Sequence, residues 1–246
     1  MASRGFTALS ILTVSTTLLG CASTQPKVAG DPLQSMNRSI YAFNGKVDTY
    51  VARPVAKGYE NVTPRPVQTA VRNFFSNLGD IGNFANDTLQ LKPTAATEDL
   101  MRFAFNSTFG IAGLIDWATP AGIPKHHQDF GLTLARYGVQ IGPYLVLPLL
   151  GPSSIRDVSN VAFNALTNPF QGAPFAVTAS MTGVHVVSGR ADMLGTTDLL
   201  EAASLDQYAF VRNFYLNRRR MLAAKPGAPT EVPQYSDNTT LTPGTP

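Results

Sequence analysis

The 246-residue sequence is poor in cysteine, in charge and in histidine. Its one cysteine, Cys21, has no partner for an intramolecular disulfide, so packing alone must hold the fold. Charged residues make up 14% of the chain, against roughly 25% in an ordinary soluble domain. This shortage predicts that much of the surface meets a partner or lipid. The net charge of +3 is too small to favour nucleic-acid binding.

A long uninterrupted apolar run is also missing. The most apolar stretch, residues 141–152 (IGPYLVLPLLGP), contains three prolines. It is about half as long as the roughly 20 residues that a spanning helix needs, and prolines interrupt helices. A transmembrane helix is therefore excluded at this stretch. Two interpretations are open, a buried core strand or turn and a wedge that dips part-way into a bilayer.

No arrangement of residues that supports catalysis is evident. The chain has no Gly-x-Ser-x-Gly motif and no phosphate-binding glycine loop. His126 and His127 are adjacent, His185 is isolated, and Gly131 and Leu132 occupy the positions where an acyltransferase-like pattern needs Asp. We therefore predict satisfied core or surface histidines, no enzyme activity, no cofactor and no metal site. The aspartates suit helix caps and ion pairs; they include Asp80, Asp87, Asp116 and Asp157.

The N-terminus follows the plan of a signal peptide that ends in Leu18-Leu19-Gly20-Cys21. This ending resembles a bacterial lipobox, which predicts that Cys21 is the lipid-modified first residue of the mature chain. The alternative is an ordinary secreted protein with a stray cysteine near its cleavage site. Composition predicts a signal peptide over 1–20, a lipidated tether over 21–30, one helical domain over 31–223 and a disordered tail over 224–246.

Apolar residues recur at helical spacing through most of the predicted domain, and none of it shows sustained strand alternation. The chain is thus predicted to be mainly α. We expect Asp31 to cap a first helix that Pro54 ends or kinks, Gly79 and Gly82 to break a second, and Pro93 to stop a third. Further helices are expected over 97–106, 155–166, 175–187 and 205–222, the last with Tyr208, Val211, Phe214 or Tyr215, and Leu222 on its inner side. The run Arg218-Arg219-Arg220 suits a solvated helix end or, alternatively, contact with anionic headgroups.

Ordered sequence blocks along the predicted domain resemble the MlaA family, also called VacJ lipoproteins. The blocks include Asp31-Pro32-Leu33 with Met36-Asn37-Arg38, Tyr41-Ala42-Phe43-Asn44, Asn73-Phe74-Phe75-Ser76-Asn77-Leu78, Phe109-Gly110-Ile111-Ala112-Gly113-Leu114-Ile115-Asp116, Gly142-Pro143-Tyr144-Leu145-Val146-Leu147-Pro148, Gly151-Pro152-Ser153-Ser154 with Arg156-Asp157, and Ser204-Leu205-Asp206. The chain departs from the family at Leu132, where Gln is common, and at Gln207, where Pro is common. These departures weaken local details of the match only.

The resemblance implies a single domain of amphipathic helices that forms a ring around a central channel in the inner leaflet of the outer membrane. It implies a lipid-anchored, non-enzymatic phospholipid transporter of a Gram-negative bacterium, facing the periplasm. Such a protein removes mislocalised phospholipid from the outer leaflet and passes it to a soluble, MlaC-like periplasmic carrier. A trimeric porin is the implied membrane partner. The rival hypotheses are a scaffolding lipoprotein without lipid passage and a lipid-modifying hydrolase.

A proline- and glycine-rich loop over residues 118–129 lies between two of the matched blocks. Stiff prolines next to glycine hinges suggest a gate that borders the channel. The candidate gate residues are Gly113, Pro120, Gly122, Pro124 and Gly131. A solvent-exposed connector is the alternative. The sequence also leaves open whether the apolar helix stripes face inward, as in a soluble protein, or outward.

Overall fold

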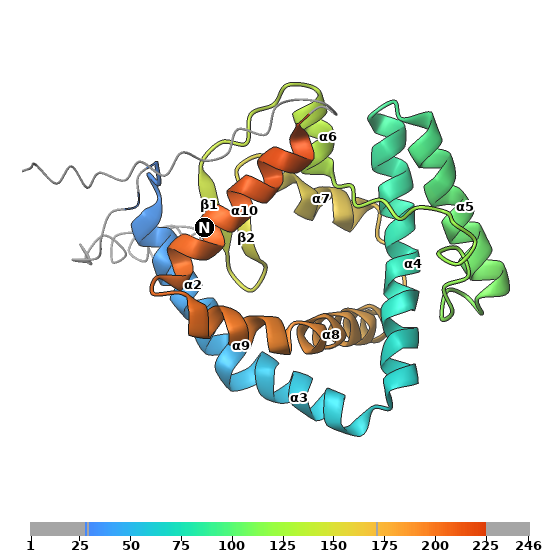
Figure 1. Ribbon diagram of the computed structural model, residues 1–246, viewed down its shortest axis with the longest axis horizontal. Coiled ribbons are helices and arrows are strands. Elements are labelled where there is room, and N and C mark those ends of the chain that lie inside the picture. Colours follow the sequence, from blue (N-terminus) through green and yellow to red (C-terminus); the bar gives the residue numbers. More distant parts are fainter. Residues whose placement is uncertain (1–27, 29, 171, 225–246) are drawn as a thin grey trace, which may run out of the picture.

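The computed structural model describes residue 28 and residues 30–170 and 172–224, and it is mainly helical, as the sequence predicts. Its helices follow one another around a ring, with a small β-hairpin on one side (Figure 1). The helices are α2 (Gln34–Val47), a π-helical segment (Asp48–Ala52), α3 (Arg53–Val62), α4 (Arg65–Leu89), α5 (Pro93–Phe109), α6 (Phe130–Arg136), α7 (Ser159–Leu166), α8 (Phe175–Asp192), α9 (Leu194–Ala203) and α10 (Gln207–Ala223). Among the described residues, no helix has both the length and the hydropathy that crossing a membrane requires.

The first predicted helix does not end at Pro54. Both junction residues, Asp48 and Arg53, keep right-handed helical backbone angles, so α2, the π-helical segment and α3 form one continuous helical path. Proline has no N–H to donate and its ring crowds the preceding turn, which a local π-type widening accommodates. Asp31 is not the helix cap either, because α2 begins at Gln34 without a side-chain cap.

The prediction that Gly79 and Gly82 break the second helix is wrong. α4 runs unbroken through both glycines and ends only at Leu89. Glycine in a helix is unfavourable by about 1 kcal/mol relative to alanine, which tertiary packing along 25 residues can override. Pro93 begins α5 rather than stopping a helix, since proline fits the first helical turn. Helix α5 therefore starts four residues before the predicted helix start at residue 97.

The apolar stretch at 141–152 forms part of the hairpin, in which β1 (Tyr144–Leu147) pairs antiparallel with β2 (Gly151–Ser154). Two asparagines of α2, seven residues apart and so on one helix face, hold the outer edge of β1. Asn37 donates to the Tyr144 carbonyl (3.0 Å) and accepts from the Val146 N–H (2.9 Å). Asn44 repeats the pattern near the turn, donating to Leu147 O (2.9 Å) and accepting from Leu149 N–H (2.8 Å). The core-strand interpretation is thus confirmed for β1.

A small apolar core lies where the hairpin meets α2 and α10. Its buried members are Tyr144, Val146, Tyr208 and Leu216. The inner face of α10 differs from the prediction, because Tyr208 alternates with arginines: Arg212 and Arg219 are buried, whereas Phe214 is exposed. The sequence predicted either a solvated helix end or a headgroup contact for the basic run at 218–220, and the buried Arg219 fits neither. Tyr208 and Tyr215 of the predicted apolar stripe do pack in the core, whereas Leu222 is exposed. Arg212 and Arg219 share the buried face and pair with Asp31 and Asp157.

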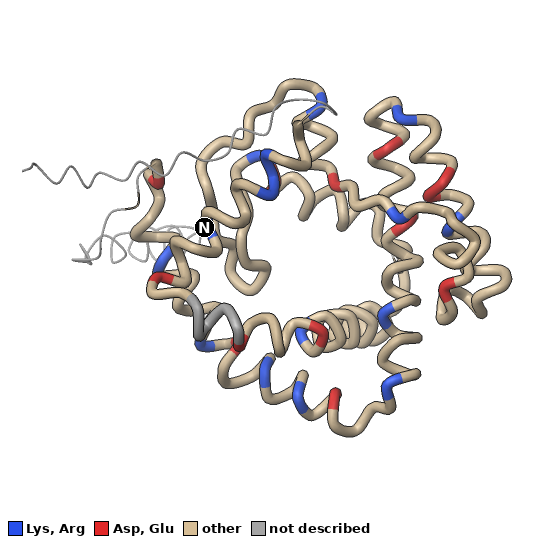
Figure 2. The backbone as a smooth tube through the Cα atoms, in the orientation of Figure 1, with Lys and Arg blue, Asp and Glu red and all other residues tan. Residues whose placement is uncertain are grey.

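The pair α4 and α5 is polar inside and apolar outside. All the buried side chains of α4 are polar: Gln68, Asn77, Asp80, Asn83, Asn86 and Asp87. On α5 the buried set includes Asp99, Arg102 and Asn106, while apolar side chains such as Leu100, Phe105 and Phe109 are exposed. Charged residues are sparse around the ring, and α8 carries them only near its C-terminal end (Figure 2). The orientation left open by the sequence is therefore decided for α5, whose apolar side chains are exposed while its polar ones face α4.

Candidate functional site

A pocket of about 550 Å³ lies on the inner side of the ring, between α4, α7, α8 and the loop that precedes α6. Its wall mixes amides, hydroxyls and charged groups with aromatic and aliphatic side chains. The lining includes Phe75, Leu78, Gly79, Gly82, Asn83, Asn86, Lys125, His127, Gln128, Asp129, Asn164, Asn168, Phe170, Met181, Thr182 and His185. Such a mixture suits an amphipathic ligand, since polar and apolar parts each find matching surface.

Asn83 of α4 fixes the loop end that borders the pocket. Its side-chain amide donates to the His126 carbonyl (2.7 Å) and its oxygen accepts the Gln128 N–H (2.9 Å). Lys125 lies beside this clamp, donating to the Ser76 carbonyl (2.7 Å) and pairing with the buried Asp80. Backbone groups that would otherwise lack partners are thus satisfied by one helix face.

The start of the same loop is held by α5. Asn106 accepts the N–H groups of Trp117 (2.8 Å) and Ala118 (2.9 Å). The buried Arg102 donates to the Ile123 carbonyl (2.6 Å) and pairs with Asp116 (3.3 Å). These bonds follow from the polar interior of the helix pair, which offers amides and a guanidinium to the loop backbone.

Ion pairs hold the last residue of the loop, Asp129. Arg219 of α10 bridges Asp129 and Asp157, with Nη2 2.9 Å from Asp129 Oδ1 and 2.8 Å from Asp157 Oδ1. Burial alone raises the pKa of Asp157, but hydrogen bonds from Tyr215 and Arg156 and the charge of Arg219 hold it below its usual value. Asp129 also caps α6 by accepting the Leu132 N–H (2.9 Å). The last helix is thereby tied to the pocket wall.

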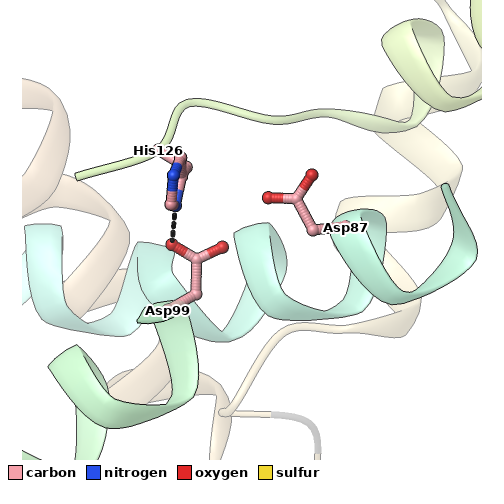
Figure 3. A group of neighbouring side chains, drawn as sticks. All are labelled: Asp87, Asp99 and His126. Carbon is pink, nitrogen blue, oxygen red and sulfur yellow. Dashed lines mark hydrogen bonds and ion pairs between the residues drawn. The ribbon is translucent and has the colours of Figure 1, made fainter. Parts of the chain in front are cut away.

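On the other side of the loop, two buried carboxylates meet a histidine (Figure 3). Asp87 of α4 and Asp99 of α5 are fully buried, and His126 Nδ1 lies 3.0 Å from Asp99 Oδ1. The Nε2 atom of His126 lies 3.4 Å from the Glu98 carboxylate. Burial raises the pKa of Asp99 to about 6, the charge of Asp87 adds to the rise, and contact with His126 opposes it.

The three histidines have distinct settings. The prediction of satisfied histidines fits His126, which has two carboxylate partners, and His185, whose ring stacks on Phe75 with centroids 4.5 Å apart. Burial lowers the pKa of His127, and the nearby charges of Lys125 and Arg218 lower it further. His127 and His185 both line the pocket, a location that their sequence positions did not indicate.

The five candidate gate residues do not form one group in space. Gly113, at φ +92°, packs so closely on the Asn77 side chain that a Cβ would collide with it. Gly131 lies in α6 against Asp157 and Arg219, where a Cβ would also collide. Pro120, Gly122 and Pro124 are exposed and are not in the pocket wall. The predicted loop instead reaches the pocket through residues 125 and 127–129, and its gating role stays a prediction.

Sequence comparison assigns this architecture to a known family. A family model described as MlaA lipoprotein matches residues 29–222. The chain belongs to the MlaA lipoprotein family. It is 34% identical over 223 residues to the intermembrane phospholipid transport system lipoprotein MlaA of Escherichia coli K12, covering 87% of this chain and 88% of that protein. The MlaA lipoprotein of the same transport system in Haemophilus influenzae is 31% identical over 244 residues, covering 92% of this chain and 96% of that protein.

The MlaA fold is found in a solved structure as well. A chain from a study of the structural basis for maintenance of bacterial outer membrane lipid asymmetry superposes with a TM-score of 0.69 at 33% identity. The match covers 79% of this chain and 99% of that one. The family resemblance inferred from the sequence blocks is therefore confirmed.

Proposed function

We propose that this protein is a non-enzymatic phospholipid transporter that takes mislocalised phospholipid from the outer leaflet of the outer membrane. The lipid passes through the ring and is handed to a soluble periplasmic carrier, which preserves the lipid asymmetry of the membrane. The observation that carries this proposal is the helix pair α4–α5, whose buried side chains are mostly polar and whose exposed ones include large apolar groups. The mixed pocket beside it supports the same function.

The physical reason lies in the two halves of a phospholipid. Moving a charged headgroup through hydrocarbon strips its water and costs several kcal/mol unless polar groups replace that water. The Asn164 amide and the Thr182 hydroxyl offer such replacements on the pocket wall, and Phe170 and Met181 give the acyl chains apolar contact. Outward-facing apolar side chains on α5 suit lipid or an apolar partner surface.

Attachment and partners complete the proposal. Cys21, which lies outside the described residues, is the proposed site of lipidation, and it anchors the chain on the periplasmic face of the outer membrane. Several acyl chains are needed for stable anchoring, as a lipoprotein N-terminus supplies. A trimeric porin is the proposed membrane partner, and an MlaC-like periplasmic carrier is the proposed recipient of lipid. The E. coli relative is named as part of an intermembrane phospholipid transport system, which supports a multi-protein route.

Two glycines of α4 allow a direct test of passage through the pocket. Gly79 and Gly82 line the pocket, and a Cβ on either would meet nothing within 4 Å. The double variant Gly79→Leu/Gly82→Leu therefore adds two side chains to the pocket wall at positions where the Cβ atoms are unobstructed. Leucine is a better helix former by about 0.8 kcal/mol per site, so the variant should fold at least as well. Gly58→Leu on α3 is the matched control, because it is exposed, open and outside the pocket.

The assay is outer-leaflet phospholipid, measured in intact cells that lack the native protein and carry each variant. We expect the double variant to accumulate outer-leaflet phospholipid like the deletion strain, and Gly58→Leu to clear it like the wild type. Normal clearance by a folded double variant, together with no lipid co-purifying with the wild type, would favour the scaffolding hypothesis. Release of fatty acid from labelled phospholipid by the purified protein would favour the hydrolase.

The gating role of the loop at 118–129 is a separate proposal. Its support is the position of Lys125, His127 and Gln128 in the pocket wall. Ser76→Cys and Lys125→Cys, on facing sides of a contact between loop and α4, can be joined by a short reducible thiol crosslinker. We expect the bridged protein to stop clearing lipid and to recover on reduction to the level of the unbridged double variant, with the single variants giving the effect of each substitution alone. Unchanged clearance in the fully bridged form would remove the gating role.

A further inference from the structure

Three side chains that come from separate segments converge beneath the loop (Figure 3). One ligand atom each from Asp87, Asp99 and His126 lies within 4.8 Å of the other two. Both aspartates are fully buried, whereas the His126 side chain keeps 24% of its surface exposed. The cluster therefore joins α4, α5 and the loop at one point, with an opening toward solvent on the histidine side.

Three of the four carboxylate oxygens of this cluster have no hydrogen-bond partner among the described residues. Neither oxygen of Asp87, nor Oδ2 of Asp99, accepts a hydrogen bond from any described residue. The nearest described cation to Asp87 is Lys92 Nζ at 3.6 Å, on a side chain that is 36% exposed. Buried carboxylate oxygens that accept no hydrogen bond are unfavourable, and two such acids side by side favour a further positive species between them. One carboxylate oxygen of Asp87 points toward the other two side chains, into the place such a species would take.

We propose that Asp87, Asp99 and His126 bind a divalent transition-metal ion, and that Zn²⁺ matches this donor set best. One imidazole nitrogen with two carboxylates is a set that zinc accepts, whereas Mg²⁺ and Ca²⁺ prefer oxygen ligands alone. Ligand atoms about 2.0 Å from a tetrahedral zinc ion stand about 3.3 Å apart. The 3.0 Å between His126 Nδ1 and Asp99 Oδ1 is close to that spacing.

The surroundings of His126 favour Nδ1 as the metal ligand. Glu98 lies 3.4 Å from Nε2, so it can accept the proton on that nitrogen and leave Nδ1 with a free lone pair. Carboxylate groups behind ligating histidines orient the ring in this way. Asp87 then completes the set by a side-chain rotation of about 1.5 Å, since it already lies within 4.8 Å of both other ligands.

A bound ion would tie the loop to the helix pair at residues that adjoin the pocket wall. The carbonyl of His126 is already held by Asn83, which lines the pocket, so the ion and the amide clamp the same residue. The positions of Lys125 and His127 in the pocket wall would then depend on the metal. Metal binding neither requires lipid transport nor follows from it, so either can fail alone.

The test uses the full-length lipoprotein, purified in detergent without a polyhistidine tag. Metal content is measured by mass spectrometry as purified and after dialysis against EDTA followed by Zn²⁺, Mn²⁺ or Mg²⁺. We expect about one zinc ion per chain. Binding should weaken by more than about 100-fold in His126→Gln and by about tenfold in Glu98→Gln, the usual range for an orienting group. His127→Gln, the neighbour outside the cluster, should bind as the wild type does.

Substitution with Co²⁺ supplies a readout that does not depend on stability. Tetrahedral cobalt gives strong visible absorption, which should appear in the wild type and in His127→Gln and vanish in His126→Gln. Circular dichroism shows whether each variant is folded, and Asp99→Asn serves as a second ligand variant if His126→Gln is not. A folded wild type that binds none of the three metals would overturn the proposal in favour of a proton shared by the two carboxyls. Zinc retained equally in all variants would also overturn it.

Discussion

Asn37 and Asn44 make the same pair of bonds to the hairpin in different surroundings, which makes their replacement informative. Each side chain donates to one strand or turn carbonyl and accepts one N–H. Both bonds of Asn37 are buried, whereas the Asn44 bonds are part-buried or exposed at the turn. Alanine at either position removes the two bonds to the hairpin, and at Asn37 it also removes a 3.4 Å bond to Asp31. Only at Asn37 are the abandoned backbone groups cut off from water.

The expected magnitudes follow from that difference. A buried group left without a partner costs about 1–3 kcal/mol, so Asn37→Ala should lower the free energy of unfolding by about 2–5 kcal/mol. Water replaces the lost partners of Asn44, and Asn44→Ala should cost about 1 kcal/mol or less. Total stabilities of about 5–15 kcal/mol make the first loss severe and the second mild.

Urea unfolding of the two variants in detergent, followed by circular dichroism, measures both losses. Hydrogen exchange at the Val146 and Leu149 amides reports the same bonds individually. Exchange at Val146 should accelerate in Asn37→Ala, and exchange at Leu149 in Asn44→Ala. Equal losses in the two variants, or unchanged exchange at Val146, would refute the idea that α2 holds the strand edge through Asn37.

Three further outcomes are expected. The pKa of Asp157 is lower in the folded protein than in the unfolded chain, where it is about 4. The ionised Asp157 therefore stabilises the fold fully above about pH 4, and this contribution is lost as the pH falls through the folded-state pKa. Asp157→Asn should thus cost about 3–5 kcal/mol at pH 7, and its stability deficit against wild type should shrink below about pH 4 in urea titrations. Cys21→Ala should abolish N-terminal lipidation and release protein from the outer membrane, as fractionation and mass spectrometry would detect; an unmodified Cys21 in the wild type would contradict this. Removal of the residues after Lys225 should leave the melting temperature and lipid clearance unchanged, because that segment is poor in apolar residues; a large drop in either would mean that the tail docks.

Much of the fold could be predicted from the sequence, because helical periodicity is local. The helices at 155–166, 175–187 and 205–222 were expected close to where α7, α8 and α10 lie. The wrong predictions of helix boundaries were made at glycine and proline residues. Gly79 and Gly82 sit inside a helix and Pro93 begins one, since propensities of about 1 kcal/mol yield to packing along a long helix.

The candidate site was much less accessible to prediction. The family blocks contain Asn73, Asn77 and Asp157 but do not say which side of a helix is buried. Asp87, Asp99 and His126 lie 12 and 27 residues apart in the chain, a spacing that fits no metal motif, and the sequence therefore predicted no metal. Arg219 looked like part of a solvated basic end, and only its contacts with Asp129 and Asp157 place it inside.

The sequence by itself determined the helical class and the family, because each is written in local patterns of residues. Only the tertiary structure decided that α4 and α5 bury their polar faces and that α5 exposes apolar side chains. An amphipathic stripe has the same period whichever way it points, so its direction depends on what surrounds the helix. The amides of Asn83 and Asn106 find the loop backbone, and the carboxylates of Asp80 and Asp116 find cations, only when the chain closes on itself.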